Sequence, residues 1–192
     1  MITDTGVATI TELGIVTEID LRNEAVGKVT GSAVEGVSYV QCPMASNVSY
    51  YDNNRESVVK VFELLADENN YPIVFHCAIG TDRTGYVAFL INALLGVERE
   101  GIYRDYLFSN FGNIGAARGL SGVKIDYMDR IMQYGNGTIA ENCEAFLLDI
   151  GVQQEHIDAV RAILLENNVP ISIWPTQRGK LHQSAFLIQR NL

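Results

Sequence analysis

A short apolar strand followed by a long apolar helix constrains the fold of this chain more than any other feature. Residues 72–75 (Pro-Ile-Val-Phe) form a compact apolar run of the kind that is buried in a parallel sheet. Residues 83–95 are almost continuously apolar, which predicts a buried helix, and Gly96 is a suitable C-terminal cap. A buried strand that leads through a loop into a buried helix predicts an α/β domain.

Strands alternate with helices in the first half of the chain, and helices dominate the second half. Short strands are predicted at 18–21 and 37–42, with Pro43 stopping the second, and residues 47–55 are predicted to form a polar loop. Further helices are predicted at 56–67, 99–110, 124–133, 141–150 and 154–167, with a helix or turn at 7–13 and extended segments at 171–174 and 184–189. We therefore predict a parallel-rich central sheet flanked by helices.

The loop between the buried strand and the buried helix carries the residues that point to chemistry. From residue 76 to residue 85 it has the sequence His-Cys-Ala-Ile-Gly-Thr-Asp-Arg-Thr-Gly. A Cys followed six positions later by an Arg is weak evidence alone, because chance supplies it in roughly 15% of such chains. Requiring His76, Gly80, Thr84 and Gly85 as well lowers that chance by several orders of magnitude, so this loop predicts a functional site.

The residue types in this loop suit the binding of a phosphate dianion. Successive backbone N–H groups of a tight loop converge on one point, and the helix N-terminus adds a favourable dipole. Gly80 allows backbone conformations that a Cβ atom forbids, and the Arg83 guanidinium can bind two phosphate oxygens. These donors should lower the pKa of Cys77 and make it nucleophilic, with His76 orienting the loop and the Thr84 hydroxyl stabilising the departing thiolate. The predicted phosphate-binding residues are Ala78, Ile79, Gly80, Thr81 and Thr84.

This loop resembles the signature His-Cys-x-x-Gly-x-x-Arg-Thr-Gly of the protein tyrosine and dual-specificity phosphatase superfamily. It is most similar to the bacterial tyrosine-phosphatase-like branch, whose loop commonly has Lys-Asp-Arg-Thr-Gly after its glycine. Segments 19–22, 102–110 and 144–165 resemble other parts of that branch in the same order, so the resemblance covers about residues 6–167. It implies a cysteine-phosphatase fold and hydrolysis of phosphate monoesters through a phosphocysteine intermediate, with no metal and no cofactor.

Two departures from this branch affect the expected site. Thr81 replaces the usual Lys, which removes a positive charge and weakens the case for a phosphoinositide substrate. The superfamily usually takes its general acid from an Asp on a separate loop, and no Asp directly follows the second strand. Asp82 and Asp52 are the candidates, and Asp82 is favoured because it matches the branch and must lie close to the phosphate. Asp20 is predicted to be a structural carboxylate that pairs with an Arg or with the backbone.

The C-terminal residues resemble a segment that normally begins this branch. That segment, similar to Gly-x-Leu-x-Arg-Ser-x-x-Leu, is absent before the first helix, whereas residues 178–187 resemble it. We expect a phosphatase domain at residues 1–169 and a segment at residues 170–192 that completes the same sheet. Circular permutation, or excision from tandem copies, would explain this order, and contacts through residues 176–190 would then permit domain exchange. An unrelated C-terminal extension is the alternative.

Composition limits the partners and the compartment. A chain of 192 residues with 47% hydrophobic and 19% charged residues is expected to form one soluble domain. Its formal net charge of -9 argues against affinity for nucleic acid or anionic membranes, and a phosphorylated substrate needs a local positive site. No signal peptide and no membrane-spanning run are evident. We expect a cytoplasmic protein, while a secreted parent chain stays open.

The remaining cysteines and histidines are given structural roles. Cys42 and Cys143 are predicted to pack in the core, with a redox partnership between Cys42 and Cys77 as the alternative. His156 and His182 lie among polar residues and are predicted to be solvated surface positions.

The expected activity is protein tyrosine phosphatase activity on a phosphorylated protein or a small phosphate ester. Three alternatives stay open at this point. An inositol phosphate or phosphoinositide substrate is the first, and an inactive phosphate-binding module is the second. A thiol enzyme that transfers sulfur or reduces arsenate is the third, and the match of the flanking segments argues against it.

Overall fold

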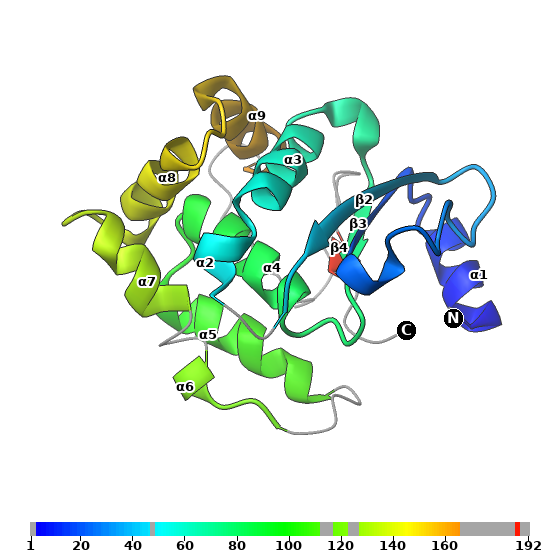
Figure 1. Cartoon of the computed structure of the whole chain (residues 1–192), viewed down its shortest axis with the longest axis horizontal. Coiled ribbons are helices and arrows are strands. Elements are labelled where there is room, and N and C mark those ends of the chain that lie inside the picture. The colour runs from blue at the N-terminus through cyan, green and yellow to red at the C-terminus, as the bar shows by residue number, and fades with distance from the viewer. Residues whose placement is uncertain (1–2, 47–48, 112–116, 123–126, 166–186, 189–192) are drawn as a thin grey trace, which may run out of the picture.

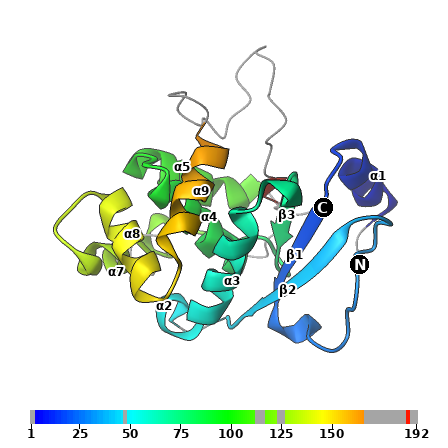
Figure 2. The same ribbon diagram turned by 90° about the horizontal axis from the view of Figure 1, so that it is seen from above.

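A parallel sheet lies between one N-terminal helix and a larger group of helices (Figures 1 and 2). The computed structural model describes residues 3–46, 49–111, 117–122, 127–165 and 187–188. In chain order its elements are α1 (Asp4–Glu12), β1 (Thr17–Arg22), η1 (Asn23–Ala25), β2 (Ser38–Met44), α2 (Tyr50–Asn53), α3 (Arg55–Leu65), η2 (Glu68–Asn70), β3 (Ile73–His76), α4 (Arg83–Leu94), α5 (Arg99–Phe108), η3 (Ser109–Phe111), α6 (Leu120–Gly122), α7 (Asp129–Ile131), η5 (Met132–Tyr134), α8 (Ile139–Asp149), α9 (Gln154–Leu164) and β4 (Leu187–Ile188).

Within the described part of the chain, the strands form one sheet in the order β2-β1-β3-β4, and every neighbouring pair is parallel. β1 and β3 are the two inner strands, and Ile19 of β1 lies opposite Val40 of β2 and Phe75 of β3. Because parallel strands end at the same edge of a sheet, the residues that follow β1 and β3 are brought together there. The predicted parallel-rich sheet flanked by helices is confirmed.

The two faces of the sheet bury different clusters of side chains. In β3, Ile73 and Phe75 belong to the main core, which also contains residues of α3, α4 and α8. Val74 belongs to a smaller cluster with Ile10 of α1 and Ile15. Figure 2 shows α1 across the sheet from α3 and α4. Since β3 is covered on both faces, its first three residues are all apolar and buried.

Helix α4 is buried along its whole length. It contacts β3 on one side and the helices α5 and α8 on others, so apolar residues surround its axis rather than forming one stripe. Gly96 follows it with a φ of +76°, in the left-handed region that glycine favours at the end of a helix. Because α4 begins at Arg83, the loop before it is anchored directly to the core.

Two predictions near the edge of the sheet were wrong. β2 does not stop at Pro43 but continues to Met44, because an edge strand tolerates a residue without an N–H and the pairing with β1 is irregular there. The polar segment 47–55 is not a loop throughout, since it contains α2. Tyr51 of this helix is buried and donates its hydroxyl to the carbonyl oxygen of Tyr127 at 2.9 Å. A distant contact thus stabilises a helix too short for its local sequence to predict.

The other predicted elements correspond closely to the structure. The strands before the loop correspond to β1, β2 and β3, and the longer predicted helices correspond to α1, α3, α4, α5, α8 and α9. Residues 124–126 of the predicted helix 124–133 lie outside the described residues, and the rest of it is helical without a gap, including α7 and the start of η5. The extended segment 171–174 lies outside the described residues. Within the segment 184–189, Leu187 and Ile188 form β4 and pair with Val74 and Phe75 of β3.

Cys42 and Cys143 are buried core residues, as predicted, and neither forms a disulfide. The redox alternative for Cys42 loses support because β1 lies between β2 and β3, which puts those strands roughly 9–10 Å apart, beyond disulfide reach. His156 is half-buried on α9 rather than solvated, and its Nδ1 has no hydrogen-bond partner among the described residues, so that prediction was wrong. His182 lies outside the described residues.

Candidate active site

The Cys77 loop, defined here as residues 76–84, joins the carboxyl end of β3 to the first turn of α4. His76 is the last residue of β3 and Arg83 is the first residue of α4, so buried elements hold both ends of the loop. Gly80 has a φ of +79°, a conformation that would strain a residue with a Cβ atom. The predicted setting of the loop between a buried strand and a buried helix is therefore present.

Cys77 follows directly after β3, and 9% of the residue is exposed. The backbone N–H of Gly80 donates a hydrogen bond to its Sγ over 3.3 Å. Burial alone raises the pKa of Cys77, but the nearby Thr84 hydroxyl and the backbone N–H groups of Thr84, Ile79 and Gly80 lower it and outweigh the burial. The net result is a lowered pKa, which favours the nucleophilic thiolate.

The two threonine hydroxyls of the loop are buried, whereas its tip is exposed. Thr81 and Thr84 are fully buried, and neither hydroxyl has a hydrogen-bond partner of normal geometry among the described residues. The Thr84 hydroxyl still lies close enough to Cys77 to lower its pKa, as its predicted role requires. Ala78 and Ile79 are exposed, so a ligand can approach the loop from that side.

The Arg83 side chain is held by two residues that sequence reasoning missed. Only 7% of it is exposed, and its Nη1 and Nη2 donate to the two carboxylate oxygens of Glu24 at 2.6 and 2.9 Å. Nη1 also donates to Oδ1 of Asn23 at 3.1 Å. These bonds fix the plane of the guanidinium beside Cys77. The hydrogen bonds from Arg83 are the largest influence on Glu24 and lower its pKa to about 2.

Glu24→Gln is expected to lower kcat/KM for para-nitrophenyl phosphate by about 10-fold, mainly by raising KM, because the variant keeps one acceptor but loses the bidentate ion pair. Since the pKa of Glu24 is lowered to about 2, this pair stabilises the native fold above roughly pH 4.5 and is lost as the pH falls towards 2. Steady-state kinetics at pH 6 measures the effect, and Glu12→Gln on the exposed face of α1 is the matched control. An unchanged KM would contradict this role.

His76 is fixed by a second residue that was not predicted. Its Nε2 lies 2.9 Å from Oε1 of Glu18 on β1, and its Nδ1 lies 3.4 Å from the carbonyl oxygen of Cys77. Glu18 also accepts a hydrogen bond from the Ser32 hydroxyl. The imidazole therefore connects the neighbouring strand to the start of the loop, and this geometry supports the hypothesis that His76 orients the loop.

Asp20 is a structural carboxylate, as predicted. It is fully buried and accepts from the Nε, Nη2 and backbone N–H of Arg22 at 2.9, 2.7 and 2.9 Å, and from the Tyr39 hydroxyl at 2.6 Å. Burial raises the pKa of Asp20, but these hydrogen bonds outweigh it and the net pKa is lowered. Both carboxylate oxygens of Asp20 accept hydrogen bonds within the fold, which favours the ionised form. Asp20 therefore has no proton to donate to a substrate.

The two candidates for the general acid lie in different elements. Asp82 is in the Cys77 loop, where its carboxylate oxygens lie 3.3 and 3.2 Å from Nη2 of Arg118. Asp52 is on α2 and accepts from the Ser49 hydroxyl at 2.6 Å and from Nη2 of Arg130 at 3.0 Å. The Ser49 hydrogen bond, more than any other influence, lowers the pKa of Asp52. The position of Asp82 inside the loop favours it, and its role stays a prediction.

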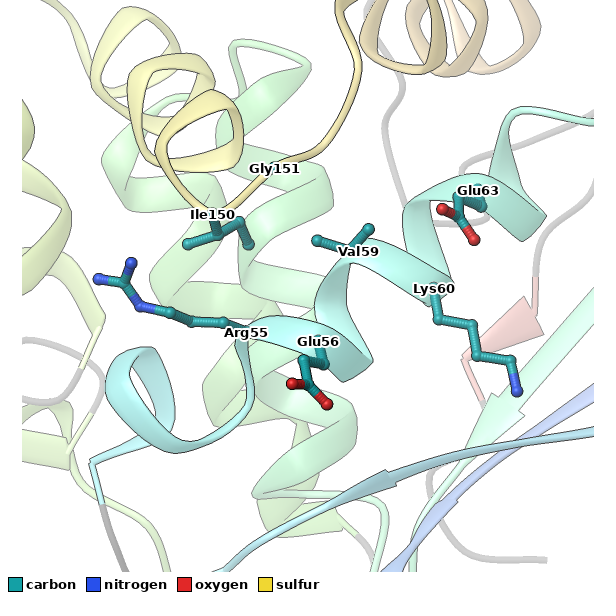
Figure 3. A pocket seen from close by; sticks show the side chains of 7 residues that line it. All are labelled: Arg55, Glu56, Val59, Lys60, Glu63, Ile150 and Gly151. Atoms are coloured by element: carbon teal, nitrogen blue, oxygen red, sulfur yellow. The ribbon is translucent and has the colours of Figure 1, made fainter.

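A surface hollow on the outer side of α3 does not compete with this site. It has a volume of about 430 Å³ and is lined by Arg55, Glu56, Val59, Lys60, Glu63, Ile150 and Gly151. Figure 3 shows the cationic ends of Arg55 and Lys60 pointing away from one another, so they do not converge on one anion. No nucleophile lines this hollow. Within the described ranges there is also no group of three His, Cys, Asp or Glu side chains placed to bind a metal ion.

Comparison with known proteins agrees with the geometry of the loop. The model of the tyrosine phosphatase family matches residues 1–166, a range close to the one that the resemblance covers. The chain belongs to the tyrosine phosphatase family. Its Cys77 loop, with the preceding β3 and the following α4, lies in the middle of the matched region.

Individual relatives within the tyrosine phosphatase family are matched over shorter stretches. The triple specificity protein phosphatase PtpB of Mycobacterium tuberculosis is 26% identical over 122 residues, which are 49% of this chain and 44% of that protein. A tyrosine-protein phosphatase of Nostoc commune is 32% identical over 62 residues, which are 32% of this chain and 21% of that protein. The chain therefore matches less than half the length of these relatives. Along the described residues, no helix is long and apolar enough to cross a membrane.

Proposed function

We propose that this chain is a protein tyrosine phosphatase that hydrolyses phosphate monoesters through a phosphocysteine intermediate. The observation that carries the proposal is the Cys77 thiol, whose pKa is lowered by the hydrogen-bond donors of its own loop. Arg83 adds a fixed cation on the same loop. Membership of the tyrosine phosphatase family supports the same reaction.

The proposed first step is attack of the Cys77 thiolate on phosphorus. The S–P bond forms as the bond from phosphorus to the ester oxygen breaks, and Asp82 donates a proton to the departing oxygen. Arg83 and the backbone N–H groups of the loop stabilise the charge on the remaining phosphoryl oxygens. Water then attacks phosphorus and gives a proton to the Asp82 carboxylate, and the S–P bond breaks. This step releases inorganic phosphate and restores the thiolate, with the Thr84 hydroxyl stabilising it. Neither step requires a metal ion.

A phosphotyrosine residue of a protein is the proposed substrate class. Thr81 is buried and uncharged, so the loop itself offers Arg83 as its cation, which suits a single phosphate group. The net charge of -9 supports a partner that is neither nucleic acid nor an anionic membrane. The free cysteines Cys42, Cys77 and Cys143 support a reducing, cytoplasmic location.

Hydrolysis of para-nitrophenyl phosphate in the presence of EDTA tests the proposed reaction. The reduced chain should release para-nitrophenol and inorganic phosphate in equal amounts, and added divalent metal should not accelerate it. A folded, reduced chain that binds phosphate without turnover would instead support the phosphate-binding module. Turnover that EDTA removes would contradict the mechanism.

We also propose that residues 170–192 complete the sheet of the same domain. The supporting observation is β4, whose two residues pair in parallel with β3 and cover an edge that β3 would otherwise expose. Circular permutation or a tandem-repeat origin is the proposed reason for this order, with strand exchange between copies as its consequence. Deletion of residues 170–192 should lower the thermal midpoint by several degrees, since about 1 kcal/mol of lost stability shifts a domain of this size by roughly 2–4 °C. An unchanged midpoint would favour an unrelated extension.

A further inference from the structure

The buried side chain of Tyr127 connects the Cys77 loop to a part of the chain that lies 45 residues beyond it. Only 3% of Tyr127 is exposed, and its hydroxyl donates to the carbonyl oxygen of Asp82 at 3.1 Å. The same oxygen accepts from the N–H of Tyr86 at 2.8 Å, which is a hydrogen bond of the first turn of α4. One donor therefore belongs to α4 itself, whereas Tyr127 ties this turn to the rest of the core.

The Asp82 carbonyl belongs to the peptide group that precedes Arg83. In a trans peptide the N–H points away from the C=O. Because the carbonyl is directed along α4 towards Tyr86, the N–H of Arg83 points out of the amino end of the helix. Helix N-terminal N–H groups have no partner within their helix and bind anions, and the N–H of Thr84 at this end lowers the pKa of Cys77. The peptide thus presents a donor where the phosphate must bind.

The position of Tyr127 is itself well fixed. Its carbonyl oxygen accepts from the hydroxyl of Tyr51 on α2 at 2.9 Å. Four aromatic rings lie around its own ring, with centroids 5.5 to 6.1 Å away: those of Tyr50, Tyr86, Phe89 and Tyr106. Replacement of Tyr127 by Phe therefore leaves the ring packed and removes the hydrogen bond to the loop.

We propose that Tyr127 is a positioning residue whose hydroxyl fixes the peptide between Asp82 and Arg83 and so aims the N–H of Arg83 at the phosphate of the substrate. This inference rests on the proposed function and adds to it a residue outside the signature loop. The peptide joins the proposed general acid to the arginine that binds the phosphate, so its orientation affects both. Tyr51 supports this arrangement by holding the backbone of Tyr127.

Inorganic phosphate, used as a competitive inhibitor of para-nitrophenyl phosphate hydrolysis by the full-length chain, tests this proposal. Tyr127→Phe should raise the inhibition constant about 3- to 10-fold, as expected for the loss of one neutral hydrogen bond. Alkylation of Cys77 by iodoacetate should keep its pH dependence, because the N–H groups that lower the pKa of Cys77 belong to other peptides of the loop. A general loosening of the loop would instead move the alkylation profile to higher pH.

Tyr71→Phe is the matched control, since the half-buried Tyr71 also donates its hydroxyl to a backbone carbonyl, that of Leu65, at 2.8 Å. Tyr71 lies before β3, at the opposite end of this strand from the Cys77 loop, so the inhibition constant should not change. Tyr51→Phe should raise the constant by less than Tyr127→Phe does. The double variant should match Tyr127→Phe alone, because Tyr51 acts through the Tyr127 hydroxyl.

Thermal unfolding shows whether each variant is folded. An unchanged inhibition constant in Tyr127→Phe, an equal rise in Tyr71→Phe, or an alkylation profile of Tyr127→Phe moved to higher pH would overturn this inference and leave the phosphatase reaction intact. Should Tyr127→Phe fail to fold, Tyr51→Phe is the deciding variant, and an unchanged constant there would overturn the inference. Absence of turnover in the folded, reduced native chain would overturn the proposed function and this inference together.

Discussion

Cys77→Ser is expected to lower kcat for para-nitrophenyl phosphate by about 10⁴-fold or more, which is the scale seen when a covalent nucleophile is removed. The hydroxyl that replaces the thiol fits the same buried volume, but its proton is not removed near neutral pH. The hydrogen bonds from Gly80 and Thr84 stabilise a thiolate and cannot offset that difference. Release of phosphate from para-nitrophenyl phosphate as the only substrate measures the loss, and thermal unfolding followed by circular dichroism shows whether the variant is folded.

Alkylation provides a second readout of the same thiolate. Iodoacetate at pH 6 should modify Cys77 in the native chain, because its pKa is lowered. Cys42 should remain unmodified, since burial raises its pKa to about 11, and burial raises the pKa of Cys143 even further. Cys42→Ala is the matched control and should leave turnover and alkylation of Cys77 in place. Modification of Cys42 ahead of Cys77 would contradict the assignment of the nucleophile.

Arg83→Ala is expected to lower kcat/KM by about 10³-fold, the loss typical of an arginine that stabilises a phosphoryl transition state. The change removes the fixed cation beside Cys77 and leaves Glu24 without its partner. Glu24 is 49% exposed and can be solvated, so the fold should survive the substitution. Steady-state kinetics together with competitive inhibition by inorganic phosphate measures the effect on the transition state and on ground-state binding.

Arg83→Lys separates charge from geometry. The lysine keeps a positive charge but cannot bridge both carboxylate oxygens of Glu24 while facing the phosphate. We expect it to recover about 10-fold of the activity lost in Arg83→Ala, through its charge alone. Full recovery would show that the bidentate contact with Glu24 has no role, and activity within 10-fold of native in Arg83→Ala would exclude Arg83 from the chemistry.

The parts of the site that sequence predicts are contiguous in the chain. His76, Cys77, Gly80 and Arg83 fall within one loop, and the apolar runs on both sides of it fix the strand and the helix. The partners Glu18, Glu24 and Arg118 are absent from any such motif. They meet the loop because of the register between β1 and β3 and the course of the chain after α5, which depend on tertiary packing.

The errors in the fold have the same origin. The polar composition of 47–55 favours a loop, but the burial of Tyr51 against Tyr127 forms α2 there. Pro43 is a sound terminator for a central strand, yet β2 lies at an edge of the sheet, where pairing on one side suffices. Local patterns specify which segments are buried, whereas the neighbours of each segment decide where it ends. The position of Glu24 could have been predicted, because Glu24 directly follows β1 and the parallel sheet places the end of β1 beside the end of β3.

The partners of the Cys77 loop come mostly from one short stretch of neighbouring chain. Glu18 contacts His76 from within β1, and Glu24 contacts Arg83 from the turn directly after it. Anyone grafting this catalytic loop onto another parallel scaffold would therefore have to transplant two adjacent segments in register, 18–24 and 76–84. A graft of the signature loop alone would leave the imidazole of His76 and the guanidinium of Arg83 without these carboxylate partners. Such a graft would have the motif but not the contacts that orient its side chains.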